Sequence, residues 1–367
     1  MNMASLRDIP SWVWPVAATV LVLGLFLFVS PVAGLAVLSV GLLTAVVMFS
    51  GWRRVVQIFV VLVLVTFFAS QLIRFLPGDP TDTLIGFATP EQKAQVRDDL
   101  GLNDNTFSQY GRFMKDFFTG ETRYYQSSGR VVGGEKVWDR LGTALPVSLQ
   151  LMLYAQILAL AFAIPIGIVA AYRAGSRLDK GLNTAAFALL SLPNFVLAYI
   201  LIYWLAVKND FFPTSGYTEF GENISEHFKS MFLPAVSLAV GQIAVYMRLL
   251  RSDMIQTLQE DFITMARAKG LSTRRILLRH ALRPSSFSLL TVAAINLGAL
   301  IGGAVILEVI FQLPGVGLLL FQAISERQYV ALQTFVGIIA IAYVFANVAV
   351  DVLYSVLDPR IRGARAA

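Results

Sequence analysis

The chain has 367 residues, of which 56% are hydrophobic and only 14% charged. Soluble domains carry about 25% charged residues, so this composition excludes an ordinary soluble protein. The formal net charge of +6 would suggest nucleic acid as a partner of a soluble chain, but here the basic residues gather between apolar runs, which indicates membrane topology and no nucleic-acid partner.

Eight apolar runs of roughly 20 residues, the length at which a helix spans a bilayer, follow one another along the chain. Each run is continuously apolar, whereas the strands of a membrane barrel alternate. The sequence therefore predicts an all-α polytopic membrane protein. The predicted spans are Trp12–Val29, Val32–Phe49, Val55–Leu76, Leu145–Tyr172, Leu182–Val207, Phe232–Leu250, Ser286–Phe311 and Leu332–Leu357.

Basic clusters orient these spans relative to the membrane. If all eight runs cross, four basic clusters fall on one side, which the positive-inside rule makes cytoplasmic. Both chain termini are then predicted to be cytoplasmic. The clusters are Arg53-Arg54, the group Arg173, Arg177 and Lys180, the loop 251–283, and the group Arg360, Arg362 and Arg365.

The first two runs, within residues 1–52, could be mistaken for a signal peptide, because a weakly basic start precedes an apolar stretch. A second run follows at once across Ser30-Pro31, however, and no small-residue cleavage site followed by polar sequence appears. We therefore predict a retained transmembrane hairpin, which packs on the outside of the other spans and is followed by a span over 53–76.

Residues 77–143 are predicted to form a small folded cap outside the membrane. They carry eight Lys/Arg and ten acidic residues, and long loops cross the membrane regardless of charge. Two stretches have helical character, Pro90–Leu100 and Phe107–Phe118, and Gly101 and Gly120 stand where the helices would end.

Residues 144–367 are predicted to form the core transmembrane domain. Pro165 and Pro193 lie inside predicted spans, where proline kinks a helix. A second outer loop, 208–231, contains the turn sequence Phe212-Pro213-Thr214-Ser215-Gly216.

Ionisable residues at membrane depth are candidates for a solute pathway. Glu308 lies near the outer end of its predicted span and Asp351 near the inner end of the last one. The alternative for both is solvation at an interface or local pairing, for Asp351 with the arginines that follow it. Gly298 and Gly302 form a small-xxx-small pair, which is typical of helix packing.

The loop 251–285 has the pattern of a rigid projection from the membrane. From Arg251 to Arg283 it carries seven Lys/Arg and three acidic residues. Residues 253–269 favour a helix, and Gly270 stands where a left-handed residue ends one. Ser272 can cap a second helix that runs through Arg279. The sequence thus predicts two short helices that meet at a glycine elbow.

This elbow is the candidate site for contact with a partner protein. Ala266 and Ala268 would keep its surface low, so that a groove of the partner can approach closely. The alternative is a basic amphipathic helix that lies on anionic lipid headgroups. The candidate contact residues are Glu260, Asp261, Ala266, Arg267, Ala268, Lys269, Gly270 and Leu271.

The sequence contains no pattern of an enzyme. It lacks the Gly-x-x-x-x-Gly-Lys-Ser/Thr phosphate loop, the His-Glu-x-x-His zinc motif and the Gly-x-Ser-x-Gly nucleophile turn. It has no cysteine and two distant histidines, His227 and His280, which exclude disulfides and histidine-based metal clusters. We therefore expect no catalytic residues, no metal and no bound cofactor.

An ordered set of short motifs runs along most of the chain, from Arg53 to Arg362. They are Pro77-Gly78-Asp79-Pro80; Leu100-Gly101-Leu102 with Gln109-Tyr110; Arg140-Leu141, Thr143 and Leu145; Pro165, Gly167 and Ala170-Ala171; Ser191-Leu192-Pro193 with Phe195; Phe212-Pro213-Thr214-Ser215-Gly216; Leu233-Pro234, Arg248 and Arg251; Asp261-Phe262-Ile263 with Ala266-Arg267-Ala268-Lys269-Gly270-Leu271; His280-Ala281-Leu282-Arg283; Glu308 with Ile310-Phe311; Pro314-Gly315-Val316-Gly317; Asn347, Asp351 and Tyr354; and Asp358-Pro359-Arg360-Ile361-Arg362.

In this order the motifs resemble the dipeptide/oligopeptide/nickel permease family of ATP-binding-cassette importers, specifically the first of its two membrane subunits. The elbow then resembles the cytoplasmic coupling ("EAA") loop. The resemblance implies a six-span importer domain of type I in a bacterial inner membrane, here preceded by the extra hairpin. It also implies four kinds of partner: membrane lipid, a second permease subunit, two cytoplasmic ATPase subunits that bind ATP and magnesium, and an extracytoplasmic solute-binding protein.

Three features depart from the family pattern. Gly120-Glu121-Thr122-Arg123-Tyr124-Tyr125 replaces a Gly-Asp-Leu-Gly-like turn, and Pro284-Ser285-Ser286 should change the angle at which the next span begins. The first two spans have no counterpart in the usual subunit. The rival functions are an ion-gradient-driven secondary transporter, which often shows inverted repeats and buried charges, and an intramembrane enzyme, for which no catalytic constellation appears.

Overall fold

The computed structural model describes residues 52–75, 89–99, 103–124 and 135–357. In these ranges the regular structure is helical. The elements in chain order are α3 (Trp52–Phe75), α5 (Pro90–Asp99), α6 (Thr106–Thr119), α7 (Val137–Tyr172), α8 (Arg177–Leu190), α9 (Asn194–Leu201), the π-helix η2 (Ile202–Val207), α10 (Ile224–Thr257), α11 (Asp261–Ala268), α12 (Thr273–Arg275), the π-helix η3 (Ile276–Ala281), α13 (Leu282–Phe311), α14 (Val316–Ser325) and α15 (Tyr329–Leu357).

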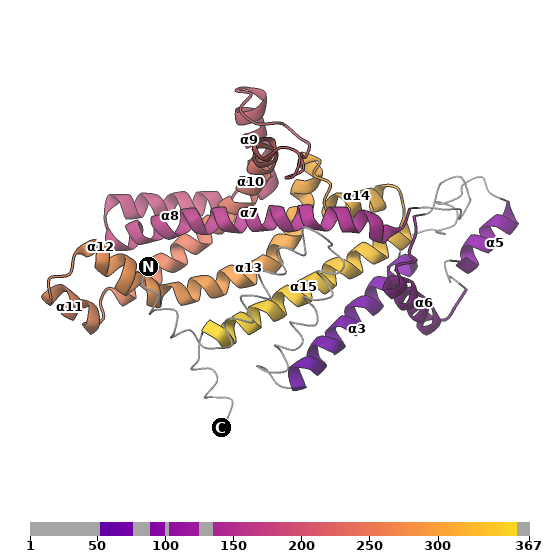
Figure 1. The fold of residues 1–367 in the computed structure, drawn as a ribbon, viewed down its shortest axis with the longest axis horizontal. Coiled ribbons are helices and arrows are strands. Elements are labelled where there is room, and N and C mark those ends of the chain that lie inside the picture. Colours follow the sequence, from indigo (N-terminus) through magenta and orange to yellow (C-terminus); the bar gives the residue numbers. More distant parts are fainter. Residues whose placement is uncertain (1–51, 76–88, 100–102, 125–134, 358–367) are drawn as a thin grey trace.

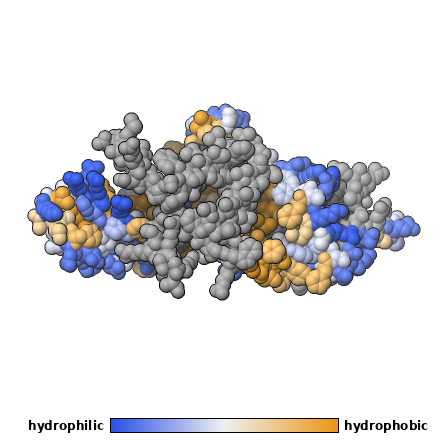
Figure 2. Space-filling view, turned by 60° about the horizontal axis from the view of Figure 1, so that its bottom comes forward, coloured by the Kyte–Doolittle hydropathy of each residue, from blue (hydrophilic) through white to orange (hydrophobic). Residues whose placement is uncertain are grey.

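The long helices lie along the long axis of the molecule, with α5 and α6 at one end and α11 and α12 at the other (Figure 1). The main hydrophobic core joins α7, α10 and α13, where Leu151, Leu250 and Leu289 are fully buried. A second core joins α6, α7, α14 and α15. Figure 2 shows hydrophilic side chains gathered toward the two ends of the long axis.

Among the described residues, three helices are long and apolar enough to cross a membrane, or up to five if each bent pair counts as one span. The three are α7, α10 and the described apolar part of α15, and the bent pairs are α8 with α9–η2 and the two halves of Thr273–Phe311. This agrees with the predicted polytopic fold. The predicted hairpin within 1–52 lies outside the described residues.

One predicted span is wrong in form. The run Leu182–Val207 does not make one kinked helix, because α8 and the segment Asn194–Val207 meet at 100°. The break falls at Ser191-Leu192-Pro193, and Pro193 is the N-cap residue of α9. Proline has no N–H to continue the α8 ladder, and it disfavours helical geometry in the residue before it. As a result α9 stands across the long axis (Figure 1).

Two glycines, Gly241 of α10 and Gly303 of α13, lie close to Asn194, the first residue of α9. A Cβ built on Gly303 in α13 would lie 3.0 Å from Leu238 Cδ1 in α10 and 3.8 Å from Asn194 Nδ2. A Cβ on Gly241 would lie 3.6 Å from Asn194 Oδ1. The contacts with Asn194 are ordinary van der Waals distances, whereas a Cβ on Gly303 would crowd the Leu238 side chain and so the packing of α13 on α10.

The helix α10 is longer than predicted. It begins at Ile224, inside the expected loop 208–231, and continues to Thr257, so the expected bounds Phe232–Leu250 cover only its middle. Asn223 caps its start by accepting hydrogen bonds from the N–H groups of Ser225 and Glu226 at 3.0 and 3.2 Å. This polar cap carries the helix beyond the apolar run from which its bounds were predicted.

The cap helices are confirmed. α5 and α6 match the predicted stretches within one residue at each end, and Gly120 ends α6 in a left-handed conformation with φ +70°. Gly101 lies outside the described residues. Tyr110 anchors α6 on α3, because its hydroxyl lies 3.0 Å from Thr66 Oγ1 and its ring meets Phe67 edge-on.

Candidate functional site

The left-handed glycine at the end of α11 forms as predicted, but the predicted helix 253–269 does not, because α10 ends at Thr257 and α11 begins at Asp261. Gly270 has φ +73°, a conformation that costs a residue with a Cβ but not glycine. Two hydrogen bonds close the helix end: Gly270 N–H donates to the Arg267 carbonyl at 2.9 Å, and Leu271 N–H donates to the Ala266 carbonyl at 3.2 Å. This pair of bonds is the Schellman motif, which fixes the direction in which the chain leaves the helix.

The second arm of the elbow differs from the prediction. It does not end at Arg279, because α12, η3 and α13 follow one another directly and continue into the membrane-spanning segment. Ser272 makes no side-chain capping bond to any described residue. Pro284 lies in the first turn of α13 without ending it. It cannot donate to the carbonyl one turn earlier, and the six residues before α13 are wound as a π-helix instead. The elbow is therefore joined directly to a span.

The surface of α11 also differs from the prediction. Ala266 is only 6% exposed and packs with the fully buried Ile263 into the main core, so it does not form a low outer surface. The side chains that project are Phe262 and Met265, at 46% and 58% exposure. The remaining predicted contact residues lie at the surface or partly so: Glu260, Asp261, Arg267, Ala268, Lys269, Gly270 and Leu271. The outward face is thus an apolar pair among charges, which is typical of a protein contact.

An ion pair ties the helices next to the elbow together. Arg251 in α10 donates to both carboxylate oxygens of Asp179 in α8, at 2.5 Å from Nε and 2.7 Å from Nη2. Asp179 is 2% exposed and also accepts from Gly175 N–H and Asn183 Nδ2, at 2.8 and 2.9 Å. A bidentate pair with its remaining acceptors satisfied holds one relative orientation of the two helices.

Amide side chains form a polar group in the middle of the spans. Asn296 of α13 donates to Gln242 of α10 at 2.8 Å, and both are half-buried. The buried Tyr246 donates to Gln156 of α7 at 3.2 Å. Polar groups at this depth are costly and mark pathways or interhelical contacts. The sequence-based prediction does not include these residues, although neutral amides inside apolar runs are a visible signal.

Glu308 has a different environment from the predicted pathway position. It is 1% exposed, and it accepts hydrogen bonds from Ser148 Oγ at 2.6 Å and from Gly317 N–H at 2.7 Å. The carboxylate thus caps the start of α14 from a neighbouring helix, where the helix dipole favours an anion. A Cβ on Gly315 would lie 2.3 Å from its Oε2. In this conformation Glu308 lines no open path. The Asp351 side chain lies outside the described part.

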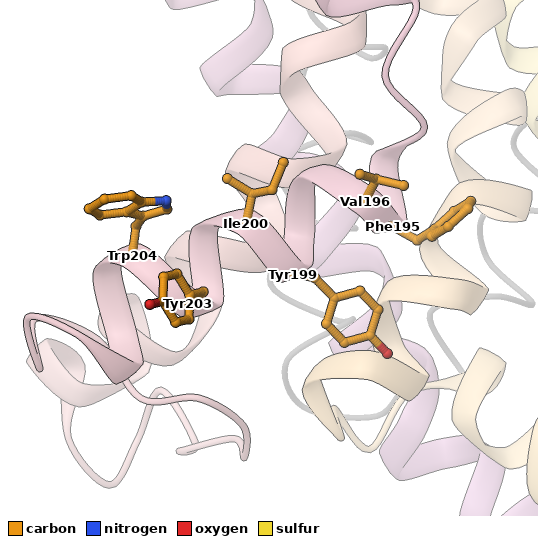
Figure 3. Close-up of a pocket in the computed structure, with 6 residues that line it drawn as sticks. All are labelled: Phe195, Val196, Tyr199, Ile200, Tyr203 and Trp204. Atoms are coloured by element: carbon orange, nitrogen blue, oxygen red, sulfur yellow. The ribbon is translucent and has the colours of Figure 1, made fainter.

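The segment that follows the break carries an exposed aromatic face. Figure 3 shows six side chains that project from α9 and η2 around a shallow pocket of about 400 Å³, with Tyr199 and Tyr203 on one side of the helix. Lys208 Nζ lies 4.0 Å from the centre of the Trp204 ring. These residues were predicted to lie in an ordinary span, whereas the structure places them after the 100° break. Among the described residues, no group of three or more His, Cys, Asp or Glu could hold a metal.

The described residues form a multi-helix bundle with helices long and apolar enough to cross a membrane, which defines a polytopic membrane protein. Comparison with known families makes this specific. Residues 163–363 match the family described as "Binding-protein-dependent transport system inner membrane component", and residues 48–152 match the N-terminal part of such membrane components. The chain belongs to this family and is a permease component rather than an enzyme.

Named relatives are similar over nearly their whole length. A probable peptide ABC transporter permease of Sinorhizobium fredii is 35% identical over 311 residues, which cover 84% of this chain and 98% of the relative. The oligopeptide transport system permease AppB of Bacillus subtilis is 33% identical, with 84% and 98% covered. The di/tripeptide transport system permease DppB of Pseudomonas aeruginosa is 33% identical, with 82% and 95% covered.

Proposed function

We propose that this chain is the translocating subunit of an ATP-driven peptide importer in a bacterial inner membrane, with both termini cytoplasmic. Its partners are a second permease subunit, two cytoplasmic subunits that bind ATP and magnesium, and an extracytoplasmic solute-binding protein. Two observations support the peptide solute and the partners: the relatives carry peptide permease names, and α11 exposes the apolar side chains of Phe262 and Met265.

The observation that carries the proposal is the direct joining of the elbow to a span. A partner that moves α11 also moves α13, because the Schellman bonds at Gly270 fix the angle and the chain stays helical through η3. The pair Arg251–Asp179 passes the same motion from α10 to α8. Coupling requires one connected element with two states. The solute-binding protein would bias these states from outside the membrane, and the ATPase subunits from inside.

Binding to the ATPase subunit rests on the outward face of α11. Phe262 and Met265 are exposed apolar side chains on a short helix that projects from the bundle. Buried in a groove of the partner, they act as anchors, and the charges of Asp261, Arg267 and Lys269 surround them as a polar rim. This arrangement suits a protein groove better than a lipid surface, because the projecting helix carries acidic as well as basic residues.

The solute path is assigned to the mid-span amides. Gln242 and Asn296 are half-buried, and each offers the donor and acceptor that a peptide bond requires. Their mutual bond at 2.8 Å uses one N–H donor of Asn296 and the carbonyl acceptor of Gln242. Glu308 acts on the path through the helix that it caps, and the predicted pathway role of Asp351 stays a prediction.

The test is purification and reconstitution of the complex. The tagged chain should co-purify with ATPase subunits, and liposomes that contain the complex and its binding protein should take up labelled di- and oligopeptides when ATP is enclosed. The matched control carries an ATPase subunit whose phosphate-loop lysine is replaced. Uptake driven by an ion gradient in that control would overturn the proposal in favour of a secondary transporter.

A further inference from the structure

A groove with a volume of about 780 Å³ lies between α3, α13 and α15. Aliphatic side chains make up most of its wall, including Ile58, Val61 and Val65 of α3 and Ala340 of α15. On α13 it is lined by the buried Gly298 and the exposed Gly302, which we call its floor. The groove is separate from the elbow and from the amide group described above.

The floor of the groove suits a helix rather than a loose chain. Gly298 and Gly302 are four residues apart, the spacing that lets another helix approach the backbone closely. A Cβ built on Gly302 would meet no described atom within 4 Å. The space above this glycine is therefore large enough for small side chains of a neighbouring helix.

We propose that the second apolar run of this chain, Val32–Phe49, packs in this groove. The run ends three residues before Trp52, where α3 begins. So short a connection makes the run an antiparallel neighbour of α3. Two antiparallel helices rise equally per residue from the turn at residues 50–51. The stretch 36–45 is therefore level with the α3 residues that line the groove.

The composition of this run fits the floor of the groove. It contains Gly41 and Ala45, a small-xxx-small pair that can face Gly298 and Gly302. The first run, Trp12–Val29, contains no two Gly, Ala, Ser or Thr residues four apart. The second run is therefore the one that can approach the glycines, and the first run lies outside it.

The proposal gives the hairpin a role in this chain. The family match begins at residue 48, so all but the last two residues of the run lie before the matched ranges. In the groove it would brace α13, the span to which the elbow is joined. This concerns packing alone and does not depend on the solute or on the identity of the ATPase.

Because the chain has no cysteine, crosslinking between pairs of introduced cysteines tests the proposal directly. Gly302→Cys, or independently Ala340→Cys, is paired with single cysteines at each position from 36 to 45 in the full chain, expressed with its transport partners in membranes. A protease site placed within 125–134 separates the two halves after treatment with a short bismaleimide. We expect crosslinks to join the two halves only for some of the positions from 36 to 45. These positions should recur every three or four residues, as on one face of a helix, and should include Gly41→Cys or Ala45→Cys.

The matched control is Ile157→Cys on α7, which is 54% exposed and lies outside the groove. It should join to none of these positions. Crosslinks of Gly302→Cys and Ala340→Cys to single cysteines placed in the apolar spans of the companion permease subunit would show that this subunit fills the groove, and would overturn the proposal. Failure of both to join to any position from 36 to 45, with the variants inserted normally, would overturn it as well and leave lipid as the occupant.

Discussion

Arg251 binds both carboxylate oxygens of Asp179, at 2.5 and 2.7 Å, and thereby joins α10 to α8 beside the elbow. The two residues are 72 positions apart in the sequence. The carboxylate is almost fully buried, while the side chain of Arg251 is 25% exposed. A buried pair of this geometry contributes more to fixing the relative orientation of α8 and α10 than to the net free energy of unfolding.

The first prediction concerns this pair. Asp179→Asn should lower stability by about 3 kcal/mol, because it leaves a partly buried guanidinium without its charge partner. Solute-stimulated ATPase activity should fall further than the amount of inserted protein does. Lys180→Gln, next to it but exposed, is the matched control. Thermal unfolding and ATPase activity of the reconstituted complex are measured, and unchanged stimulation would contradict a coupling role for the pair.

The second prediction concerns the elbow. Gly270→Val should cost about 1–2 kcal/mol locally, because the left-handed conformation crowds a β-branched side chain. A Cβ there meets no described atom within 4 Å, so the strain is in the backbone. Insertion should stay normal while uptake and stimulated ATPase activity are lost. Gly270→Asn, which tolerates positive φ, should keep most activity. Full coupling in Gly270→Val would leave the loop as a membrane-surface helix.

The third prediction separates the outer and inner faces of α11. Phe262→Ala and Met265→Ala should each weaken binding of the ATPase subunit by about 1–2 kcal/mol, or roughly tenfold, as anchors of an interface do. Thr264→Ala, exposed on the same helix, is the control. The measurement is retention of the ATPase subunit during purification at increasing salt and dilution. Normal retention in both anchor variants would place the contact elsewhere.

Ala266→Trp should act differently, because Ala266 is buried inside the chain. Overpacking of this kind costs about 1–3 kcal/mol. We therefore expect a lower unfolding temperature of the permease alone, before any partner is added. A variant with normal stability and a selective loss of ATPase binding would show that Ala266 faces the partner after all.

The fourth prediction concerns the cap on α14. Glu308→Ala leaves buried N–H groups of Gly317 and Leu318 without an acceptor, which costs about 1–3 kcal/mol for each group. Glu308→Gln, which can still accept and donate, should be milder. Gly315→Ala should resemble Glu308→Ala, because its Cβ would displace the carboxylate. Thermal unfolding ranks the three variants. Equal stability of Glu308→Ala and the native chain would exclude the capping role.

The fifth prediction concerns the outer cap. If α6 supports contact with the solute-binding protein, Tyr110→Ala should lower uptake at limiting binding-protein concentration, because it removes the contacts with Thr66 and Phe67. Tyr110→Phe keeps the ring contact, so its uptake should lie between that of the native chain and that of Tyr110→Ala. The assay is uptake against binding-protein concentration. Deletion of 90–130 with unchanged docking and uptake would refute the role of the whole cap.

Local signals made part of this molecule predictable from its sequence. Proline, glycine and capping residues act within one turn, so the ends of α5 and α6 and the left-handed Gly270 were predicted correctly. Continuous apolar runs identified the membrane bundle, because the bilayer sets their length. The ordered motifs pointed to the family that the comparisons show.

Contacts between distant residues were decided by the tertiary structure. Glu308 caps α14 together with Ser148, 160 positions away, and Asp179 pairs with Arg251 across 72 positions. Pro193 signalled a kink, but it did not give the 100° angle between α8 and the segment Asn194–Val207. Ala266 was placed on the wrong face because the sequence does not show against which neighbour a short helix packs. Periodicity and turn chemistry are local, whereas burial and pairing depend on how helices far apart in the chain meet.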